Sequence, residues 1–289
     1  MLNKIILGAA NFNKKYGLIN NNLLNDSEKV LAFAQKKKIK TIDFAPKYIA
    51  DKKTLKLIAE ARFKVISKLP SIKKISKIKL RKFIDLEIKK NLSIFKTDFI
   101  FCILFHDSKD FKLKKIREAI KILLEYKKKK IIRKLGVSVY NPEEINLILN
   151  NFKPYKPDII QLPFNIFDNR FEKTGMLKKL KKLKILVHAR SIFLQGLVFK
   201  NTRNLSKYFN KWKKKINNFN ENKSDQAIYN ICFNYVYKNK FIDGIIIGFK
   251  FEEEITKFFN SIKKLNKRIL KEIKPINDEK FVNPSNWRK

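Results

Sequence analysis

Four polar side chains with complementary proton chemistry stand at or just after three successive apolar runs. Asp43 lies in KTIDF, and Tyr48 follows five residues later. Lys68 directly follows FKVIS, and His106 follows DFIFCILF. A free tyrosine has a pKa of about 10, but a nearby ammonium group favours the phenolate, and a carboxylate keeps that ammonium charged and oriented. The set could therefore protonate an oxygen on which negative charge develops, while His106 holds that oxygen by a hydrogen bond.

Each of these residues also has a purely structural interpretation. Asp43 and Lys68 could form an ion pair between neighbouring strands, Tyr48 could pack in a loop, and His106 could satisfy backbone groups at a strand end. The order of the four residues along three consecutive strands favours the catalytic interpretation.

The elements that must position these residues alternate along the chain. Short runs rich in branched and aromatic residues predict strands, and longer lysine-studded amphipathic segments predict helices. The predicted strands cover 5–9, 40–44, 63–67, 98–105, 134–138, 158–162, 184–188 and 243–247. The predicted helices cover 27–38, 52–60, 77–94, 113–129, 142–151, 171–182, 224–238 and 251–263, with Asp26-Ser27 and Asn141-Pro142 as start signals.

Eight strands, each followed by a helix, predict a single (β/α)8 TIM barrel that spans residues 1–289 as one domain. An open doubly wound sheet is the alternative, but it calls for a glycine-rich turn after the first strand, and LGAANFNKKYG lacks that pattern. The long connection 192–223 predicts an extended loop after strand seven with an extra helix near 204–217. The tail 271–289 is expected to lie over the barrel.

In such a barrel the chemistry lies at the carboxyl ends of the strands. The later predicted strands place polar or small residues at or near these ends: Ser138, Gln161, His188, Arg190 and Gly248.

With these residues assembled, the chain resembles the aldo-keto reductase family from about residue 4 onward. The segments that carry the resemblance are TIDFAPKY, ISKLP, LFHD, LGVSVY, IIQLPFNIFDNR, VHARSIFLQGL and GIIIGFKFEEEI. QLPFNIFDNR and HARSIFLQGL are similar to a bacterial branch whose genes often lie near those for surface-polysaccharide biosynthesis. The resemblance implies NAD(P)H-dependent reduction of an aldehyde, ketone or sugar-like carbonyl. It makes Tyr48 the general acid, Asp43 and Lys68 its pKa-lowering pair, and His106 the residue that orients the carbonyl.

The resemblance also implies a cofactor-binding set: Ser138, Gln161, Arg190, Ser191, Gly248 and Lys250. Ser138 and Gln161 would hold the nicotinamide carboxamide. Arg190 stands where the family usually has a stacked aromatic ring, and a planar guanidinium can stack in the same way. Gly248 would let backbone amides approach a cofactor phosphate. Lys250 favours NADPH, with NADH as the alternative.

The chain departs from the family pattern at several positions. The run IADKKTLK follows Tyr48 where the family commonly has a glycine and then Glu-x-x-Leu-Gly. Val139 replaces a common asparagine, Phe251 a phosphate-binding arginine and Phe258 an adenine-binding asparagine. These departures motivate a second hypothesis, in which the chain binds the nicotinamide cofactor as a partner or sensor protein without turnover.

The charge of +41 could indicate nucleic acid as a partner, but only nine of the 67 basic residues are arginine, the residue typical of base readout. The lysines are spread along every predicted helix, which is typical of a solvated surface. We therefore expect a small-molecule carbonyl substrate, no specific nucleic acid, no membrane partner and a monomer. Two cysteines and no signal peptide favour a cytoplasmic protein, and two histidines leave little basis for a metal site.

Overall fold

Eight of the apolar runs form strands in the computed structural model, which describes residues 2–12, 26–46, 48, 51–200, 205–263, 270 and 273–287. Most residues of these strands are buried, as expected of a sheet that is covered on both faces. The strands are β1 (Ile5–Gly8), β2 (Thr41–Asp43), β3 (Lys64–Leu69), β4 (Ile100–Phe105), β5 (Ile132–Ser138), β6 (Ile159–Pro163), β7 (Leu186–Arg190) and β8 (Gly244–Ile247).

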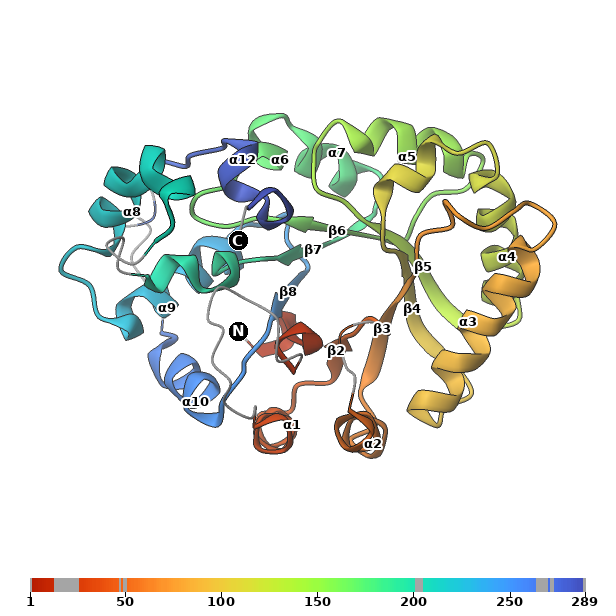
Figure 1. The fold of residues 1–289 in the computed structure, drawn as a ribbon, viewed down its shortest axis with the longest axis horizontal. Helices are drawn as coiled ribbons and strands as arrows, with labels where there is room; N and C mark the ends of the chain where they lie inside the picture. The colour runs from red at the N-terminus through yellow and green to blue at the C-terminus, as the bar shows by residue number, and fades with distance from the viewer. Residues whose placement is uncertain are drawn as a thin grey trace.

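The strands close into a barrel in chain order. Every neighbouring pair is parallel, and β1 pairs with β8 through the register Ile5↔Ile245. Figure 1 shows the helices arranged around the outside of these strands. The predicted (β/α)8 barrel is therefore confirmed, and the open doubly wound alternative is wrong.

The helices that cover the barrel bury one face each. In α3, for example, the buried Leu80, Ile84, Ile88 and Phe95 recur at helical spacing. These helices are α1 (Ser27–Lys36), α2 (Lys52–Glu60), α3 (Leu80–Phe95), α4 (Ile116–Lys128), α5 (Glu144–Phe152), α6 (Arg170–Lys173), α7 (Met176–Lys182), α9 (Asp225–Tyr237) and α10 (Glu252–Ser261).

Two helices differ from the sequence-based prediction for local reasons. The predicted helix 171–182 is divided into α6 and α7 because Gly175 adopts a φ of 74°, which ends the first helix in the left-handed region. The predicted start at Asn141-Pro142 is also wrong, because α5 begins only at Glu144. The Glu144 carboxylate accepts hydrogen bonds from the backbone N–H groups of Tyr140 and Asn141, so the chain turns before the helix begins.

A second apolar cluster joins the segment after β7 to the C-terminal segment, a contact that the sequence did not predict. In this cluster Phe281 contacts both Phe209 and Trp212, and the indole of Trp287 donates to the Phe281 carbonyl at 2.8 Å. Figure 1 places α12 between α8 and α6. The short elements outside the covering helices are η1 (Leu2–Lys4), η2 (Ala9–Phe12), η3 (Ser108–Lys112), η4 (Leu194–Phe199), η6 (Lys207–Trp212), α8 (Lys213–Asn220), α12 (Glu279–Val282) and η7 (Pro284–Asn286).

The barrel interior changes from apolar to polar along the strands. Its apolar part includes Ile66 on β3 and Ile159 on β6. The next inward positions on these strands, two residues later, are Lys68 and Gln161. Because side chains two residues apart on a strand point to the same side, these polar side chains lie inside the barrel at its carboxyl end, next to the apolar part of the interior.

Candidate active site

A buried ion pair and an amide form the centre of the site. The Lys68 ammonium donates to Asp43 Oδ1 at 2.5 Å, and Gln161 Nε2 donates to Asp43 Oδ2 at 2.7 Å. The three residues lie on β3, β2 and β6, and none is more than 5% exposed. Removing charges from water is costly, so a buried ion pair is stable only where its remaining hydrogen-bonding capacity is satisfied. Here the Gln161 amide satisfies the second oxygen of Asp43.

Tyr48 and His106 lie beside this pair. The Lys68 Nζ atom is 5.3 Å from the centroid of the Tyr48 ring. The rings of Tyr48 and His106 meet edge to face, with centroids 6.1 Å apart. Tyr48 is placed by a turn after β2, in which its N–H donates to the Ala45 carbonyl at 2.8 Å. The four residues predicted to carry the chemistry are thus brought together, although they come from three strands and their following loops.

The pKa of Tyr48 is not lowered by Lys68, in contrast to the sequence-based prediction. Burial raises the pKa of the Tyr48 phenol above its ordinary value, and the negative charge of Asp43 raises it further. The positive charge of Arg190 opposes both effects. Because Lys68 is already paired with Asp43, these two residues present little net positive charge to the phenol. Tyr48 is therefore protonated at neutral pH, the state that a proton donor needs.

The residues predicted to hold a nicotinamide ring lie at the ends of β5, β6 and β7. Ser138 and Gln161 are partners in the β5–β6 register, and both are buried. The Arg190 guanidinium lies 4.2 Å from the centroid of the Tyr140 ring and donates to the Val139 carbonyl at 2.9 Å.

Ser191, which follows Arg190, has a φ of 59°, a conformation uncommon for residues other than glycine. Its carbonyl accepts a hydrogen bond from the Asn165 amide at 3.1 Å. The contact holds the chain at the point where it leaves β7.

The described contacts of Gly248 and Lys250 lie on the β1 and α10 side of the barrel. A Cβ atom on Gly248 would lie 2.6 Å from the Asn11 Oδ1 atom and 3.0 Å from the Gly8 carbonyl oxygen, so a larger residue here would displace the Asn11 side chain. The backbone N–H of Lys250 donates to a carboxylate oxygen of Glu254 at 2.6 Å, and the first turn of α10 carries three glutamates. This amide is therefore already occupied by a carboxylate, at the helix end where a cofactor phosphate was expected.

Two residues of the site were given no role in the sequence-based prediction, although His188 was placed at a strand end. Arg170 donates to the Tyr140 carbonyl and to the Asn141 side chain, which fixes the loop after β5. His188 lies at a register position between Gln161 and Gly244, and burial lowers its pKa to about 4. The position of His188 at the end of a predicted strand was a usable signal, whereas nothing near Arg170 in the sequence indicated its partners.

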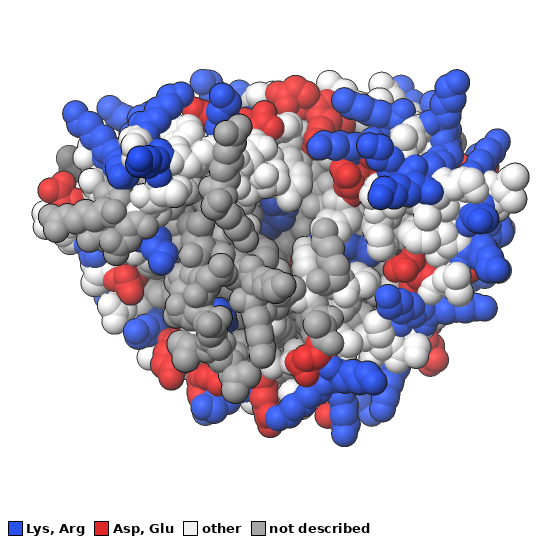
Figure 2. All heavy atoms as spheres, viewed as in Figure 1, with Lys and Arg blue, Asp and Glu red and all other residues white. Residues whose placement is uncertain are grey.

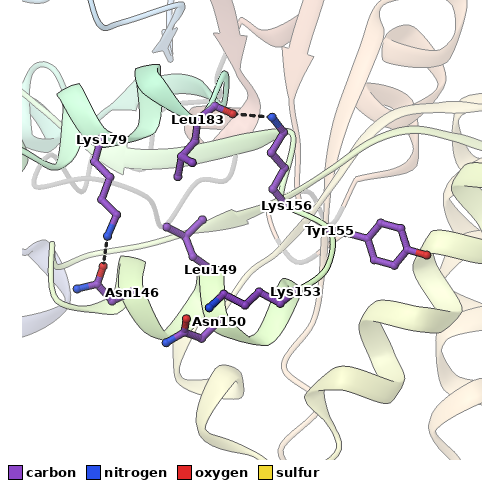
Figure 3. Close-up of a pocket in the computed structure, with 8 residues that line it drawn as sticks. All are labelled: Asn146, Leu149, Asn150, Lys153, Tyr155, Lys156, Lys179 and Leu183. Carbon is purple, nitrogen blue, oxygen red and sulfur yellow. Dashed lines mark hydrogen bonds between the residues drawn. The ribbon is translucent and has the colours of Figure 1, made fainter.

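Other kinds of site find no support in the described part of the chain. Across the described ranges, there is no group of three or more His, Cys, Asp or Glu residues that could hold a metal ion. Among the helices in the described part of the chain, none has the length and apolar character needed to cross a membrane. A surface hollow of about 560 Å³ lies between α5 and α7, and Figure 3 shows Lys153, Lys156 and Lys179 on its walls. None of the predicted site residues lines this hollow.

Comparisons with known proteins agree with this fold. The family model described as the aldo/keto reductase family matches residues 4–278. The fold is similar to that of an aldo-keto reductase from Bacillus halodurans in its holo form, with a TM-score of 0.73, 16% identity, and coverage of 98% of this chain and 95% of that one. It is also similar to a glycerol dehydrogenase from Gluconobacter oxydans, with a TM-score of 0.69, 20% identity, and coverage of 93% and 90%. No curated protein matches the chain significantly.

Proposed function

The chain belongs to the aldo/keto reductase family of oxidoreductases, and from this premise we propose that it reduces an aldehyde, ketone or sugar-like carbonyl to an alcohol. The family generally uses nicotinamide cofactors. When bound, such a cofactor supplies the hydride that adds to the carbonyl carbon. The observation that carries the proposal is the convergence of Tyr48, Lys68, Asp43 and His106 at the carboxyl end of the barrel.

In this proposal Tyr48 is the general acid. Its phenol is protonated at neutral pH because burial and Asp43 raise its pKa. It gives its proton to the carbonyl oxygen as negative charge develops there. Lys68 lies 5.3 Å from the centroid of the Tyr48 ring, but Asp43 balances its charge, so the positive charge of Arg190 is the one that favours the phenolate that remains. His106, edge to face with Tyr48, orients the carbonyl oxygen toward the phenol by a hydrogen bond.

The residues of this structure fit a nicotinamide cofactor at the ring end of the site. Ser138 and Gln161 are buried neighbours with the hydroxyl and amide groups that would hold a carboxamide. The Arg190 guanidinium lies over the Tyr140 ring, 4.2 Å from its centroid, and we propose that it also stacks on the nicotinamide.

We propose NADPH as the cofactor, with NADH as the alternative. Lys250 and the basic surface support NADPH. The glutamates in the first turn of α10, together with the Glu254 carboxylate on the Lys250 amide, weaken that preference because they repel a phosphate.

The test of the proposal compares Tyr48→Phe with Tyr155→Phe, a control that removes the hydroxyl of a tyrosine lying 62% exposed on the outer surface. We expect Tyr48→Phe to lower turnover of a carbonyl panel about 10²–10⁴-fold while cofactor binding, followed by nicotinamide fluorescence, stays nearly unchanged. Tyr155→Phe should retain the wild-type rate, and Arg190→Ala should weaken cofactor binding.

The possible results separate the hypotheses. Unchanged turnover in Tyr48→Phe removes this residue from the mechanism. Saturable cofactor binding by the wild-type protein without turnover of any carbonyl supports a cofactor-binding partner or sensor. Absence of binding by both NADPH and NADH contradicts the proposal as a whole. The ratio of the two affinities decides the cofactor.

A further inference from the structure

The Gln161 side chain has two hydrogen-bonding ends that serve different parts of the site. We infer that Gln161 is a positioning residue that links the nicotinamide carboxamide to the Asp43–Lys68 pair, so that cofactor binding and the proton-transfer residues are coupled. This inference rests on the proposed function. It gives Gln161 a second role, the contact with Asp43, in addition to the proposed contact with the carboxamide, and Ser138 has only the latter.

The coupling begins at Asp43, whose two carboxylate oxygens are held from different sides of the barrel. Oδ1 accepts from Lys68 on β3 at 2.5 Å, and Oδ2 accepts from Gln161 on β6 at 2.7 Å. All three side chains are buried. Asp43 therefore cannot reorient without losing a charge-assisted hydrogen bond in a region with little water to replace it.

The contact with Asp43 also fixes which end of the Gln161 amide faces the cofactor. An ionised carboxylate only accepts hydrogen bonds, so the NH₂ end must face Asp43, and the carbonyl oxygen is left as an acceptor. That oxygen can receive an N–H of the nicotinamide carboxamide. The orientation of the bound ring is thus tied to the orientation of Asp43.

This arrangement makes the coupling reciprocal. A donor on the Gln161 carbonyl polarises the amide and strengthens its N–H···O bond to Asp43. Because linkage works in both directions, the Asp43–Lys68 pair also raises affinity for the cofactor. Ser138 is the partner of Gln161 in the β5–β6 register but has no described contact with Asp43. It is therefore a matched control that would lose the carboxamide contact alone.

Any pH-dependent test must account for the other ionisable groups around this contact. These groups are Tyr48 and His106 after β2 and β4, Lys68 on β3, Cys102 on β4, Lys134 on β5, and His188 and Arg190 on β7. Burial raises the pKa values of Tyr48 and Cys102 and lowers that of His188 to about 4, so these three groups stay uncharged near neutral pH.

The decisive variant is Gln161→Glu, which has nearly the same shape. A glutamic acid that faces Asp43 must keep a proton between the two carboxyl groups, and this raises its pKa strongly. We expect cofactor affinity, measured by fluorescence without turnover, to fall about tenfold or more between about pH 6 and about pH 9 in Gln161→Glu. The wild-type protein and Ser138→Ala should lack this dependence, although Ser138→Ala binds more weakly at every pH.

A flat profile in Gln161→Glu overturns the inference, because a glutamate that contacts only the carboxamide would ionise near its ordinary value of about 4.3. If the wild-type protein binds no cofactor, the proposed function fails instead, so the two failures are distinguishable. If Gln161→Glu does not fold, Gln161→Met serves as the second variant. Gln161→Met and Ser138→Ala should both weaken cofactor binding, but Gln161→Met should also lower kcat further, because it removes the contact with Asp43. If the two variants lose cofactor affinity equally and their kcat values fall equally, the inference is overturned.

Discussion

A neutral imidazole lies inside the barrel, at the level where the interior becomes polar. His188 is packed beside Gly244, where a Cβ atom would approach the ring to 2.7 Å. Within the described residues its Nδ1 atom has no hydrogen-bond partner. Burial lowers its pKa to about 4, although the negative charges of Asp43 and Asp243 act in the opposite direction. The folded protein therefore binds this proton less readily than the unfolded chain does.

This difference predicts a pH-dependent stability. Between about pH 6.5 and about pH 4, His188 becomes protonated in the unfolded chain but stays neutral in the folded protein. The free energy of unfolding therefore falls as the pH falls. The contribution is fully present above about pH 6.5 and amounts to about 3 kcal/mol. We expect His188→Leu to lose stability less steeply over this interval in urea unfolding experiments. Parallel losses in the two proteins would show that His188 does not titrate as described.

At the residue scale, the sequence was sufficient for side chains whose position follows from strand ends. Asp43, Lys68 and His106 were found because parallel strands bring their carboxyl ends together. The bond between Gln161 and Asp43 joins residues 118 positions apart, on strands that are not neighbours. It depends on barrel closure and side-chain reach, which periodicity does not reveal.

At the scale of elements, one carboxylate holds the segment after β5 in place through hydrogen bonds to its backbone and to η3. Glu144, the first residue of α5, accepts from the backbone N–H groups of Tyr140 at 2.9 Å and Asn141 at 3.2 Å, and from the Ser108 hydroxyl at 2.8 Å. The loop that carries Tyr140 is thus held in the position where its ring packs against Arg190.

Removing this carboxylate should loosen the loop and weaken the fold. We expect Glu144→Ala to lower the free energy of unfolding by about 2–3 kcal/mol, because partly buried donors lose a charged acceptor. The neighbouring Glu143 is exposed, so Glu143→Ala is the matched control and should change stability by less than about 0.5 kcal/mol. Chemical denaturation of both variants measures the difference, and equal stabilities would exclude the role given to Glu144.

The number and type of the elements could be predicted because each strand and helix has its own period and its own flanking signals. The boundaries depended on contacts that the pattern does not contain. Gly175 divides a segment whose hydrophobic period is continuous, and α5 begins at Glu144, two residues after the Pro142 start signal. The chain around Tyr48 was predicted to differ from the family pattern, and residues 47, 49 and 50 lie outside the described residues.

At the scale of the whole molecule, charge is spread across the surface rather than gathered in one place. Figure 2 shows Lys and Arg side chains around much of the visible face, with Asp and Glu between them. The 67 basic residues outnumber the 26 acidic residues by 41, so the like charges of the folded protein repel one another. This distribution agrees with a solvated lysine surface.

Screening this repulsion should stabilise the protein. When the ionic strength rises from about 0.01 M to about 0.1 M, the Debye length falls from about 30 Å to about 10 Å, which weakens repulsion between distant lysines. We expect the melting temperature to rise by several degrees over this range, because the compact state gains more from screening than the expanded chain does. Thermal unfolding at constant pH measures the effect. A constant or falling melting temperature would contradict the prediction.

The pairing of β1 with β8 has a consequence for the synthesis of the protein. Ile5 pairs with Ile245, so the first strand waits for a partner that leaves the ribosome roughly 240 residues later. At elongation rates of about 5–20 residues per second, this interval lasts roughly 10–50 s. During that time one edge of β1 and its apolar side chains lack their native neighbour, and a nascent chain in this state is exposed to aggregation. The chain is therefore protected from this aggregation only when β8 has been synthesised and pairs with β1.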